Sequence, residues 1–342
     1  MSQIEITSPV SIIDDMGLPR NFGWSKTPCF FYDPGMIYQS RYRITEYDRY
    51  IAFTPTHMFI FEIRDDGWLG YMGITVISMR DKKRVTQTYS TFLPLGDYEL
   101  PTSSEIGSVN WAKGKTRLDF ICAEKGAKII KADIPKLGHH QSMRGALVLI
   151  EPESSDSLVT NQGWREEKHA FRYSRHSPWF YAEGVIQFGS SEIIFTKGNG
   201  WGIYEWIRCA RPKADIRFWA AGCGHSGGRQ LSFCVGYSWA DFAPGTENGF
   251  FVDGKLHKLD QVTFHIPTSQ WLSPWRFSSS DNRLEMEFFP HQERIDRRNA
   301  LFYNSSRRQV CGFFSGKVQL DDGSVIEFQN LTGFSERSKT RF

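Results

Sequence analysis

The chain has 342 residues, with 41 Lys and Arg against 38 Asp and Glu, so its formal net charge at pH 7 is +3. With 40% hydrophobic and 23% charged residues and a mean hydropathy of −0.41, the composition is that of a globular protein and excludes a largely disordered chain. The small positive charge gives no argument for binding nucleic acid or an anionic membrane surface.

The N-terminus and the cysteines predict a cytoplasmic protein. Met1–Glu5 is not a basic stretch followed by an apolar one, so no secretory signal is expected, and no apolar run approaches the roughly 20 residues of a membrane-spanning helix. The cysteines form no Cys-x-x-Cys pair, which favours reduced, mostly buried thiols. Cys223, His225 and Cys234 lack a fourth ligand and the usual spacing, so no metal site is expected. The six cysteines are Cys29, Cys122, Cys209, Cys223, Cys234 and Cys311.

Short β-branched and aromatic segments separated by turn residues recur along the chain, whereas helical periodicity is hard to find. Met58–Ile63 is the first predicted strand, and it ends at the turn Arg64–Gly67. The further predicted strands are Tyr71–Met79, Arg117–Ala123, Ala146–Ile150, Gly184–Phe188, Ile193–Thr196, Leu231–Gly236, Gln261–Ile266, Arg283–Phe289, Lys317–Leu320 and Ser324–Gln329. Many short strands without intervening helices predict an all-β fold of barrels or sandwiches.

Several short segments are predicted to be turns or loops. Asp253-Gly254 and Asp322-Gly323 each favour a β-hairpin, because both central residues of a type I′ turn need a positive φ. Gly222–Gly228 lies between two predicted strands and not before a helix, so a hairpin loop is expected there and not a phosphate-binding loop. His139-His140 is expected in a solvated loop.

The polar, acidic segment Glu151–Ser157 is the best candidate for a domain boundary, although a long hairpin loop would have the same composition. It divides the chain into residues 1–155 and 156–342. Each part has the size of one closed barrel.

Glu205 is the first candidate for chemistry. In the aromatic segment Trp201–Arg208, a strand would place Glu205 on one face with Ile203 and Ile207. In an apolar lumen, burial would raise the pKa of Glu205, and the side chain could then act as a general acid. A structural Glu–Arg pair and a solvent-facing Glu are the alternatives.

Three other segments carry polar side chains next to predicted strands. Tyr173–His176 precedes a predicted Pro-Trp turn, Thr246–Gly249 leads into the Asp253-Gly254 hairpin, and in Phe288–Arg294 charged residues follow an apolar strand. Each is also compatible with an ordinary loop, and the spacing does not show whether they converge with Glu205.

The chain resembles the bacterial domain-of-unknown-function family numbered 2804 over nearly its whole length. The motifs that carry this likeness are Arg49–Ile51, Glu62–Tyr71, Asp81–Arg84, Thr246–Asn248, Val252–Leu259, Trp271–Trp275, Phe288–Arg294, Gly312–Gly316, Asp322-Gly323 and Gly333–Glu336. The resemblance implies a family pattern in which an acidic residue is followed three positions later by Arg. Glu205 and Arg208 match this pattern.

A more distant likeness, carried by Tyr173–Arg175, Gly184, Trp201–Trp206 and Arg217–Trp219, is to the carotenoid hydratases and AttH-type proteins. It implies two consecutive lipocalin-like (calycin-type) antiparallel β-barrels or strongly curved sheets, one in each part of the chain, and hydratase or cyclase activity on polyene or terpenoid chains. Glu205 matches a family Glu, whereas Ile203 stands where the hydratases carry Asp.

The leading functional hypothesis is a cofactor-independent enzyme of the hydratase, cyclase or isomerase kind that acts on an apolar, terpenoid- or lipid-like substrate. Glu205 or Glu247 would transfer the proton, and the ring faces of Trp201, Trp206 and Trp219 would stabilise a developing cation. A non-catalytic carrier of a lipid or pigment is one alternative. A carbohydrate-processing enzyme with Glu205 and Glu247 as its carboxylate pair is another.

The expected partner is a small molecule, apolar or sugar-like, and neither a metal nor nucleic acid is expected. The residues predicted to bind the ligand are Tyr173, Arg175, Trp201, Trp206, Arg208, Trp219, Asn248, Arg294, Asp66 and Trp68.

Overall fold

The computed structural model describes residues 3–138, 141–300 and 303–341, so the predicted loop at His139-His140 lies outside the described residues. In these residues almost all regular structure is β-strand, which confirms the all-β prediction. The helical segments described are the short 3₁₀ helices η1 (Pro34–Met36), η2 (Arg41–Arg43) and η3 (Glu124–Gly126). β1 (Val10–Ser11) and β3 (Phe30–Phe31) form a small parallel pair.

The first large sheet contains thirteen described strands in antiparallel pairs, and it curls into a half-barrel. Its main path runs β7-β6-β5-β4-β15-β13-β11-β10-β9-β8, while β12 and β14 pair with β13, and β2 pairs with β12. The strands are β2 (Gly23–Ser25), β4 (Ile44–Phe53), β5 (His57–Asp65), β6 (Leu69–Ser78), β7 (Arg84–Phe92), β8 (Ser108–Lys113), β9 (Thr116–Cys122), β10 (Lys128–Leu137), β11 (Gln141–Ile150), β12 (Leu158–Gly163), β13 (Phe171–Phe188), β14 (Ser191–Phe195) and β15 (Trp201–Ala210).

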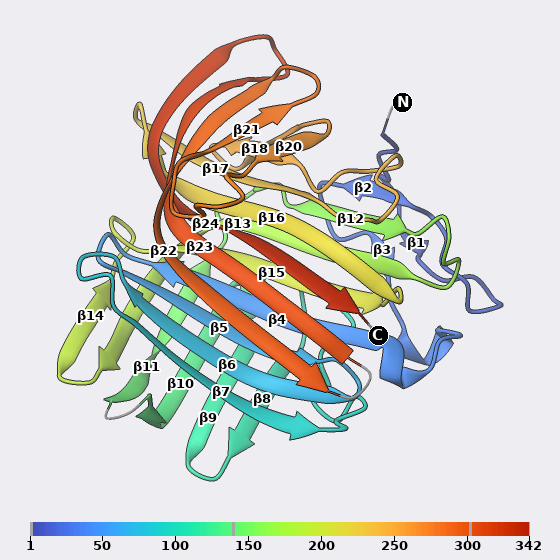
Figure 1. Ribbon diagram of the computed structural model, residues 1–342, viewed down its shortest axis with the longest axis horizontal. Coiled ribbons are helices and arrows are strands. Elements are labelled where there is room, and N and C mark those ends of the chain that lie inside the picture. The colour runs from blue at the N-terminus through green and yellow to red at the C-terminus, as the bar shows by residue number, and fades with distance from the viewer. Residues whose placement is uncertain (1–2, 139–140, 301–302, 342) are drawn as a thin grey trace.

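The second large sheet has nine described strands, again antiparallel, in the order β19-β18-β17-β16-β24-β23-β22-β21-β20. It forms the second half-barrel, seen in yellow, orange and red in Figure 1. Its strands are β16 (Ala214–Ser226), β17 (Arg229–Tyr237), β18 (Gly249–Val252), β19 (Lys255–Lys258), β20 (Val262–His265), β21 (Trp275–Ser279), β22 (Leu284–Ala300), β23 (Tyr303–Gln319) and β24 (Val325–Arg341). The prediction of two strongly curved antiparallel sheets is therefore confirmed.

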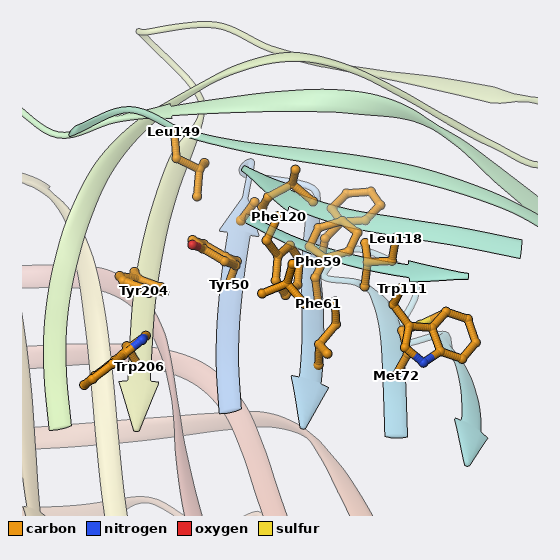
Figure 2. Close-up of a cluster of buried hydrophobic side chains, with 14 of the residues drawn as sticks. Tyr50, Phe59, Phe61, Met72, Trp111, Leu118, Phe120, Leu149, Tyr204 and Trp206 are labelled. Atoms are coloured by element: carbon orange, nitrogen blue, oxygen red, sulfur yellow. The ribbon is translucent and has the colours of Figure 1, made fainter. Parts of the chain in front are cut away.

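Alternation along the strands gives each half-barrel an apolar interior. Tyr204 and Trp206 of β15 point into the first half-barrel, where Tyr50, Phe61 and Phe120 also lie (Figure 2). The interior of the second half-barrel is a separate cluster that includes Phe233, Phe250, Phe264, Trp275, Phe277, Phe288 and Phe314. Close packing of these rings explains much of the aromatic content of the chain.

A third cluster lies between the two sheets and joins them. It combines Ile51, Phe53, Ile60 and Ile203 of the first sheet with Trp219, Ala221, Cys234 and Phe334 of the second. In Figure 1, β22, β23 and β24 extend from the second half-barrel across β4 and β5 of the first. Long-range ion pairs confirm this contact, because Arg49 binds Glu336 and Arg307 binds Glu62. The two half-barrels thus share a buried face.

The predicted strand positions agree with the structure, but several strands are much longer than predicted. β13 continues through Pro178-Trp179 with an irregular register between Ser177 and Phe180, so the predicted Pro-Trp turn is wrong. β22 likewise continues through Phe288–Arg294, with a register shift between Pro290 and Gln292. A β-bulge absorbs an extra residue and bends the strand without ending it. Short apolar runs therefore mark only the parts of a long strand that face a core.

The predicted hairpins are present, with one difference in turn type. Asp253-Gly254 has positive φ at both residues and joins β18 to β19. Asp322-Gly323 connects β23 to β24, but only Gly323 has a positive φ there, so the turn is not type I′. Gly222–Ser226 belongs to β16, and only Gly227-Gly228 forms the turn to β17.

The segment Glu151–Ser157 connects β11 to β12, which belong to the same sheet. It also binds the second half-barrel, since the Asp156 amide donates to the Gly254 carbonyl oxygen at 2.8 Å. The chain passes from the first sheet to the second later, between Ala210 and Ala214. A division into two domains near residue 155 stays a prediction.

Gly254 offers a test of this connection. Replacing Gly254 with Ala is expected to lower the free energy of unfolding by more than about 1 kcal/mol, because φ is +80° and the added Cβ would lie 2.7 Å from the Ser155 Oγ. Gly323→Ala is the matched control, since φ is +84° and nothing lies within 4 Å of the added Cβ. Urea unfolding of both variants measures the free energy of unfolding. Equal losses in the two variants would contradict a close contact between Gly254 and Ser155.

Candidate functional site

The face of β4 that meets the second half-barrel changes character along its length. At every second residue it carries apolar Phe53 and Ile51, then Arg49, and then Tyr47 and Thr45. Two partner strands show the same order, with Trp219, Arg217 and Asp215 on β16 and Phe334, Glu336 and Ser338 on β24. On β15 the charged Glu205 lies between apolar Ile203 and Ile207. The space between the sheets therefore has an apolar end, a charged middle and a polar end.

Glu205 lies in the charged middle and is fully buried. It forms an ion pair with Arg49 from the neighbouring strand, and the Arg217 Nη1 donates to its Oε1 at 2.9 Å. Burial alone would raise the pKa of Glu205, but Arg49, Arg217 and His176 outweigh burial and lower the pKa to about 2. The expectation of a raised pKa in an apolar lumen is therefore wrong, because Glu205 lies between two guanidinium groups outside both barrel interiors.

Glu247 converges with Glu205 on the same arginine. The Arg217 Nε donates to the Glu247 Oε2 at 3.1 Å, and the Ser174 hydroxyl donates to the Glu247 Oε1 at 3.1 Å. The His176 Nε2 lies 3.2 Å from the same Oε1. Burial opposes ionisation of Glu247, but Arg217 and His176 hold its pKa well below the usual range. Both predicted catalytic carboxylates are therefore ionised at neutral pH.

Two further carboxylates complete the charged middle. Glu336 accepts from both terminal nitrogens of Arg49, at 2.9 and 3.1 Å. Glu62 accepts from both terminal nitrogens of Arg307, at 2.7 and 3.0 Å, and from the Tyr71 hydroxyl. Buried ions are tolerated when they are paired and hydrogen-bonded in this way. These ion pairs link side chains of the two sheets and so fix how the sheets are aligned against each other.

The predicted tryptophans face arginines. The Trp219 ring lies 5.3 Å from the Arg49 guanidinium carbon and 5.4 Å from that of Arg217. The Trp206 ring has the Arg208 guanidinium carbon at 4.1 Å. Trp201 lies at the apolar end, near Trp179 and His225. The ring faces of Trp206 and Trp219 thus already hold protein cations, which opposes the expected role in stabilising a substrate cation.

The polar end of the space between the sheets contains a cavity of about 90 Å³. Tyr47, Ile207 and Cys209 form a small apolar cluster in its wall. Charged and hydroxyl side chains form the rest, including Arg64, Asp66, Tyr71, Arg172, Arg211, Asp215, Arg217, Asp296, Arg298, Tyr303, Ser305, Arg307, Glu336, Ser338 and Thr340. We call this region the inter-sheet cleft.

Tyr47 is the uncharged polar group that stands out in the cleft. It is only 5% exposed, and among the described residues its hydroxyl has no hydrogen-bond partner. Its ring packs under the Arg64 guanidinium at 4.8 Å. Burial and the nearby Glu205 carboxylate raise the pKa of Tyr47 above the ordinary value. The hydroxyl is therefore protonated at neutral pH and available as a donor.

Four of the predicted ligand-binding residues lie on the opposite face of the first sheet from Glu205. Tyr173, Arg175, Trp206 and Arg208 point into the first half-barrel. There Arg208 binds Asp48 at 2.9 Å, the Tyr173 hydroxyl donates to the Phe30 carbonyl oxygen, and Arg175 pairs with Glu151. The sheet separates these four side chains from the cleft.

Of the remaining predicted residues, Asp66, Trp68 and Arg294 lie at or near the cleft, whereas Trp201 and Trp219 do not line it. Asp66 lines the cleft, and Trp68 packs against the lining residue Tyr303 at 4.6 Å. Arg294 is buried and pairs with Asp296, another lining residue. Asn248 lies elsewhere, where its side chain bonds the Gly236 amide and the Asp260 carbonyl oxygen and so holds the loop before β18.

Sequence reasoning missed Tyr47, Arg49, Arg64 and Arg217 as site residues. Alternation was the available signal, because Arg217 shares a strand face with Trp219, as Glu205 does with Ile203. A charged residue on each of two apolar strand faces predicts that these faces meet. The sequence does not indicate which strands are neighbours, because β4, β15 and β24 are far apart along the chain.

The six cysteines are free thiols, and Cys209, Cys223, Cys234 and Cys311 are buried. Burial raises the pKa of the Cys223 thiol well above its ordinary value. In the part of the chain that the structure describes, no three His, Cys, Asp or Glu side chains are grouped so that they could hold a metal ion. Likewise, none of the helices among those residues has the length and apolar character needed to cross a membrane.

A family model described as "Domain of unknown function (DUF2804)" matches residues 3–342. The chain belongs to the DUF2804 family. This confirms the first resemblance seen in the sequence. No curated protein matches this DUF2804 chain in sequence.

Several solved structures are similar to this DUF2804 protein at low sequence identity. The structures of CghA, one of them with Sch210972, have a TM-score of 0.53 at 10% identity and cover 88% of this chain and 89% of CghA. A putative AttH from Nitrosomonas europaea has a TM-score of 0.48 at 13% identity, covering 91% of this chain and 98% of its own. Kievitone hydratase from Nectria haematococca has a TM-score of 0.45 at 9% identity, and the match covers 87% of this chain and 88% of the hydratase chain. At these identities, the likeness to CghA concerns the fold.

Proposed function

We propose that this DUF2804 protein is an enzyme of the hydratase, cyclase or isomerase kind, and that its substrate reacts in the inter-sheet cleft. The observation that carries the proposal is the Tyr47 hydroxyl, which is protonated, has no partner among the described residues, and borders both an apolar surface and several guanidinium groups. Converging polar groups beside an apolar surface are the usual features of a small-molecule site. CghA, whose structure contains Sch210972, indicates that a protein of this fold can hold a ligand.

The cleft suits a reaction in which negative charge develops and a proton is delivered. In hydration of an alkene conjugated to a carbonyl, a water oxygen bonds to the β-carbon and the π electrons move to the carbonyl oxygen. Guanidinium groups stabilise that enolate, and the Tyr47 hydroxyl proton passes to the α-carbon. A proton from the attacking water then returns to the Tyr47 oxygen.

Glu205 and Glu247 act in this proposal as positioning residues. Both bind Arg217, which lines the cleft, so they fix its guanidinium at the boundary between the charged middle and the cavity. Their low pKa values make them unsuitable as proton donors at neutral pH. This also weakens the carbohydrate alternative, because a glycosidase needs one carboxyl that stays protonated.

For the inter-sheet cleft, the carrier alternative receives less support from the geometry than the enzyme does. The cavity of about 90 Å³ is smaller than the roughly 300 Å³ or more of a pocket that encloses a drug-sized ligand. The cleft would hold the reacting end of a substrate while the remainder lies outside. A carrier that shields a whole lipid or pigment needs a larger enclosed space.

Occluding the cleft tests the proposal. Purified protein is incubated in D₂O with the small-molecule extract of cells that produce it, and mass spectrometry detects addition of water or exchange of hydrogen for deuterium. Ser338 lines the cleft, so Ser338→Trp should reduce turnover at least about tenfold, whereas Ser324→Trp, on an exposed loop, should not. Thermal denaturation verifies that both variants fold. Equal turnover by wild type and Ser338→Trp, or binding of an extract compound that is never transformed, would overturn the proposal.

A further inference from the structure

Arg64 has hydrogen-bond donors that the protein does not use. Its Nε donates to the Asp66 Oδ1 at 2.8 Å. Its Nη1 lies 4.0 Å from the Glu62 Oε1, which is beyond hydrogen-bond distance, and neither terminal nitrogen donates a hydrogen bond to a described residue. The side chain is 13% exposed and lines the inter-sheet cleft. A nearly buried guanidinium with unused donors is costly unless water or a ligand accepts from them.

Arg298 is a second cation of this kind on the opposite wall. Its guanidinium carbon lies 3.4 Å from the centre of the Tyr71 ring, and this residue lines the cleft. Within the described ranges, the Arg298 side chain forms no hydrogen bond and no ion pair. All five of its N–H donors are therefore available.

Tyr71 relates the two arginines to each other. It is the cross-strand partner of Arg64 in the β5–β6 pair, and Arg298 covers its ring from β22. Arg64 and Arg298 therefore approach the same part of the cleft from the two half-barrels. A ligand that reaches both would join the two sheets.

The acidic residues near these arginines have other partners. Glu62 binds Arg307 through both oxygens, and Asp296 pairs with Arg294. Asp66 accepts from Thr45 and from the Arg64 Nε, which leaves the Arg64 terminal nitrogens unused. The cleft thus has guanidinium donors in excess of the carboxylates that contact them.

We infer that the ligand of the inter-sheet cleft carries a carboxylate, held by Arg64 and Arg298, and an apolar part that packs on Tyr47, Ile207 and Cys209. This inference rests on the proposed function and names its substrate class. A planar carboxylate matches the fork of donors on a guanidinium, and such charge-assisted bonds are short and strong. A carboxylate conjugated to an alkene would also place the developing negative charge beside both cations.

Binding of simple probes tests the inference without any turnover. Isothermal titration calorimetry at low ionic strength compares benzoate with benzamide, which has nearly the same shape but no charge. The wild-type protein should bind benzoate at least about tenfold more tightly than it binds benzamide. Arg298→Gln should lose most of this preference, because it removes the charge from a residue that holds no ion pair with described residues. Arg297→Gln is the matched control, since Arg297 is exposed and does not line the cleft.

The possible outcomes are distinct. A preference for benzoate that Arg298→Gln removes and Arg297→Gln retains supports the inference. Equal binding of benzoate and benzamide, or a preference that Arg298→Gln leaves unchanged, overturns it while the proposed function stands on the Ser338→Trp experiment. Tighter binding of inorganic phosphate than of benzoate, lost in Arg298→Gln, would also overturn it, because the cleft would then select a phosphate. If neither benzoate nor benzamide binds, the inference fails as well.

Discussion

Replacing Glu205 with Gln is expected to lower the free energy of unfolding by about 3–5 kcal/mol at pH 7, the usual cost of removing one partner from a buried ion pair. The reason is that Arg49 and Arg217 both lose a carboxylate that neutralises them, and that Glu205 and Arg49 are fully buried. Urea unfolding measures the loss. Glu285→Gln is the control, because Glu285 pairs with Lys317 on the surface and should change stability by less than about 1 kcal/mol. A near-wild-type Glu205→Gln would contradict the compensating role assigned to Glu205.

The same network predicts how stability depends on pH. The pKa of Glu205 falls from 4.5 to about 2 on folding, and the pKa values of Glu62 and Glu247 are lowered as well. A group with a lowered pKa in the folded state stabilises the protein above its unfolded pKa, and this stabilisation is lost as the pH falls through the folded value. Unfolding free energy should therefore decrease from about pH 5 toward pH 2. The Glu205→Gln variant should show a shallower decrease over the same range, and a steeper one would contradict the assignment.

Replacing Tyr47 with Phe is expected to reduce turnover by about 10²–10⁴-fold, the range typical of general acid catalysis, while the melting temperature stays close to that of wild type. The hydroxyl makes no hydrogen bond to a described residue, so its removal costs little stability, and the ring remains under Arg64. Turnover is measured by the D₂O assay, and differential scanning calorimetry gives the melting temperature.

Tyr181→Phe is the control for Tyr47→Phe. Tyr181 packs against the apolar end between the sheets, and its hydroxyl bonds Gln230 outside the cleft. The Tyr181→Phe variant should retain the turnover of the wild-type protein. If Tyr47→Phe keeps full turnover, another group donates the proton. If both variants lose turnover equally, the effect is structural and the assignment of Tyr47 is wrong.

How far the sequence predicts this molecule depends on whether a property is local. The hairpin at Asp253-Gly254 and the strand Met58–Ile63 follow from turn chemistry and alternation, and both are confirmed. The length of β13 and β22 was underestimated, because bulges at Pro178 and His291 resemble strand ends in a sequence. Residue types alone do not distinguish a bulge from a turn.

The site was predicted less well, since it depends on contacts between distant segments. Glu205 was identified as unusual because a carboxylate stands on an apolar face, and one stated alternative was a structural Glu–Arg pair. The structure supplies two arginines, one from β4 and one from β16, and these reverse the expected pKa shift. Tyr47 could not be selected from among 13 tyrosines. Tyr47 stands out in the cleft because its hydroxyl makes no hydrogen bond to a described residue. This property depends on all the residues that surround Tyr47 in space.

The ion pairs between the half-barrels also affect the order in which the chain can fold during synthesis. Domains generally fold as they leave the ribosome, N-terminal part first. When the nascent chain has reached Ala210, all thirteen strands of the first sheet have been made, yet Arg307 and Glu336 have not. Glu62 then lacks its bidentate partner, and Arg49 lacks one of its two carboxylates. The first sheet therefore reaches its final electrostatic balance only after the last strands have been translated.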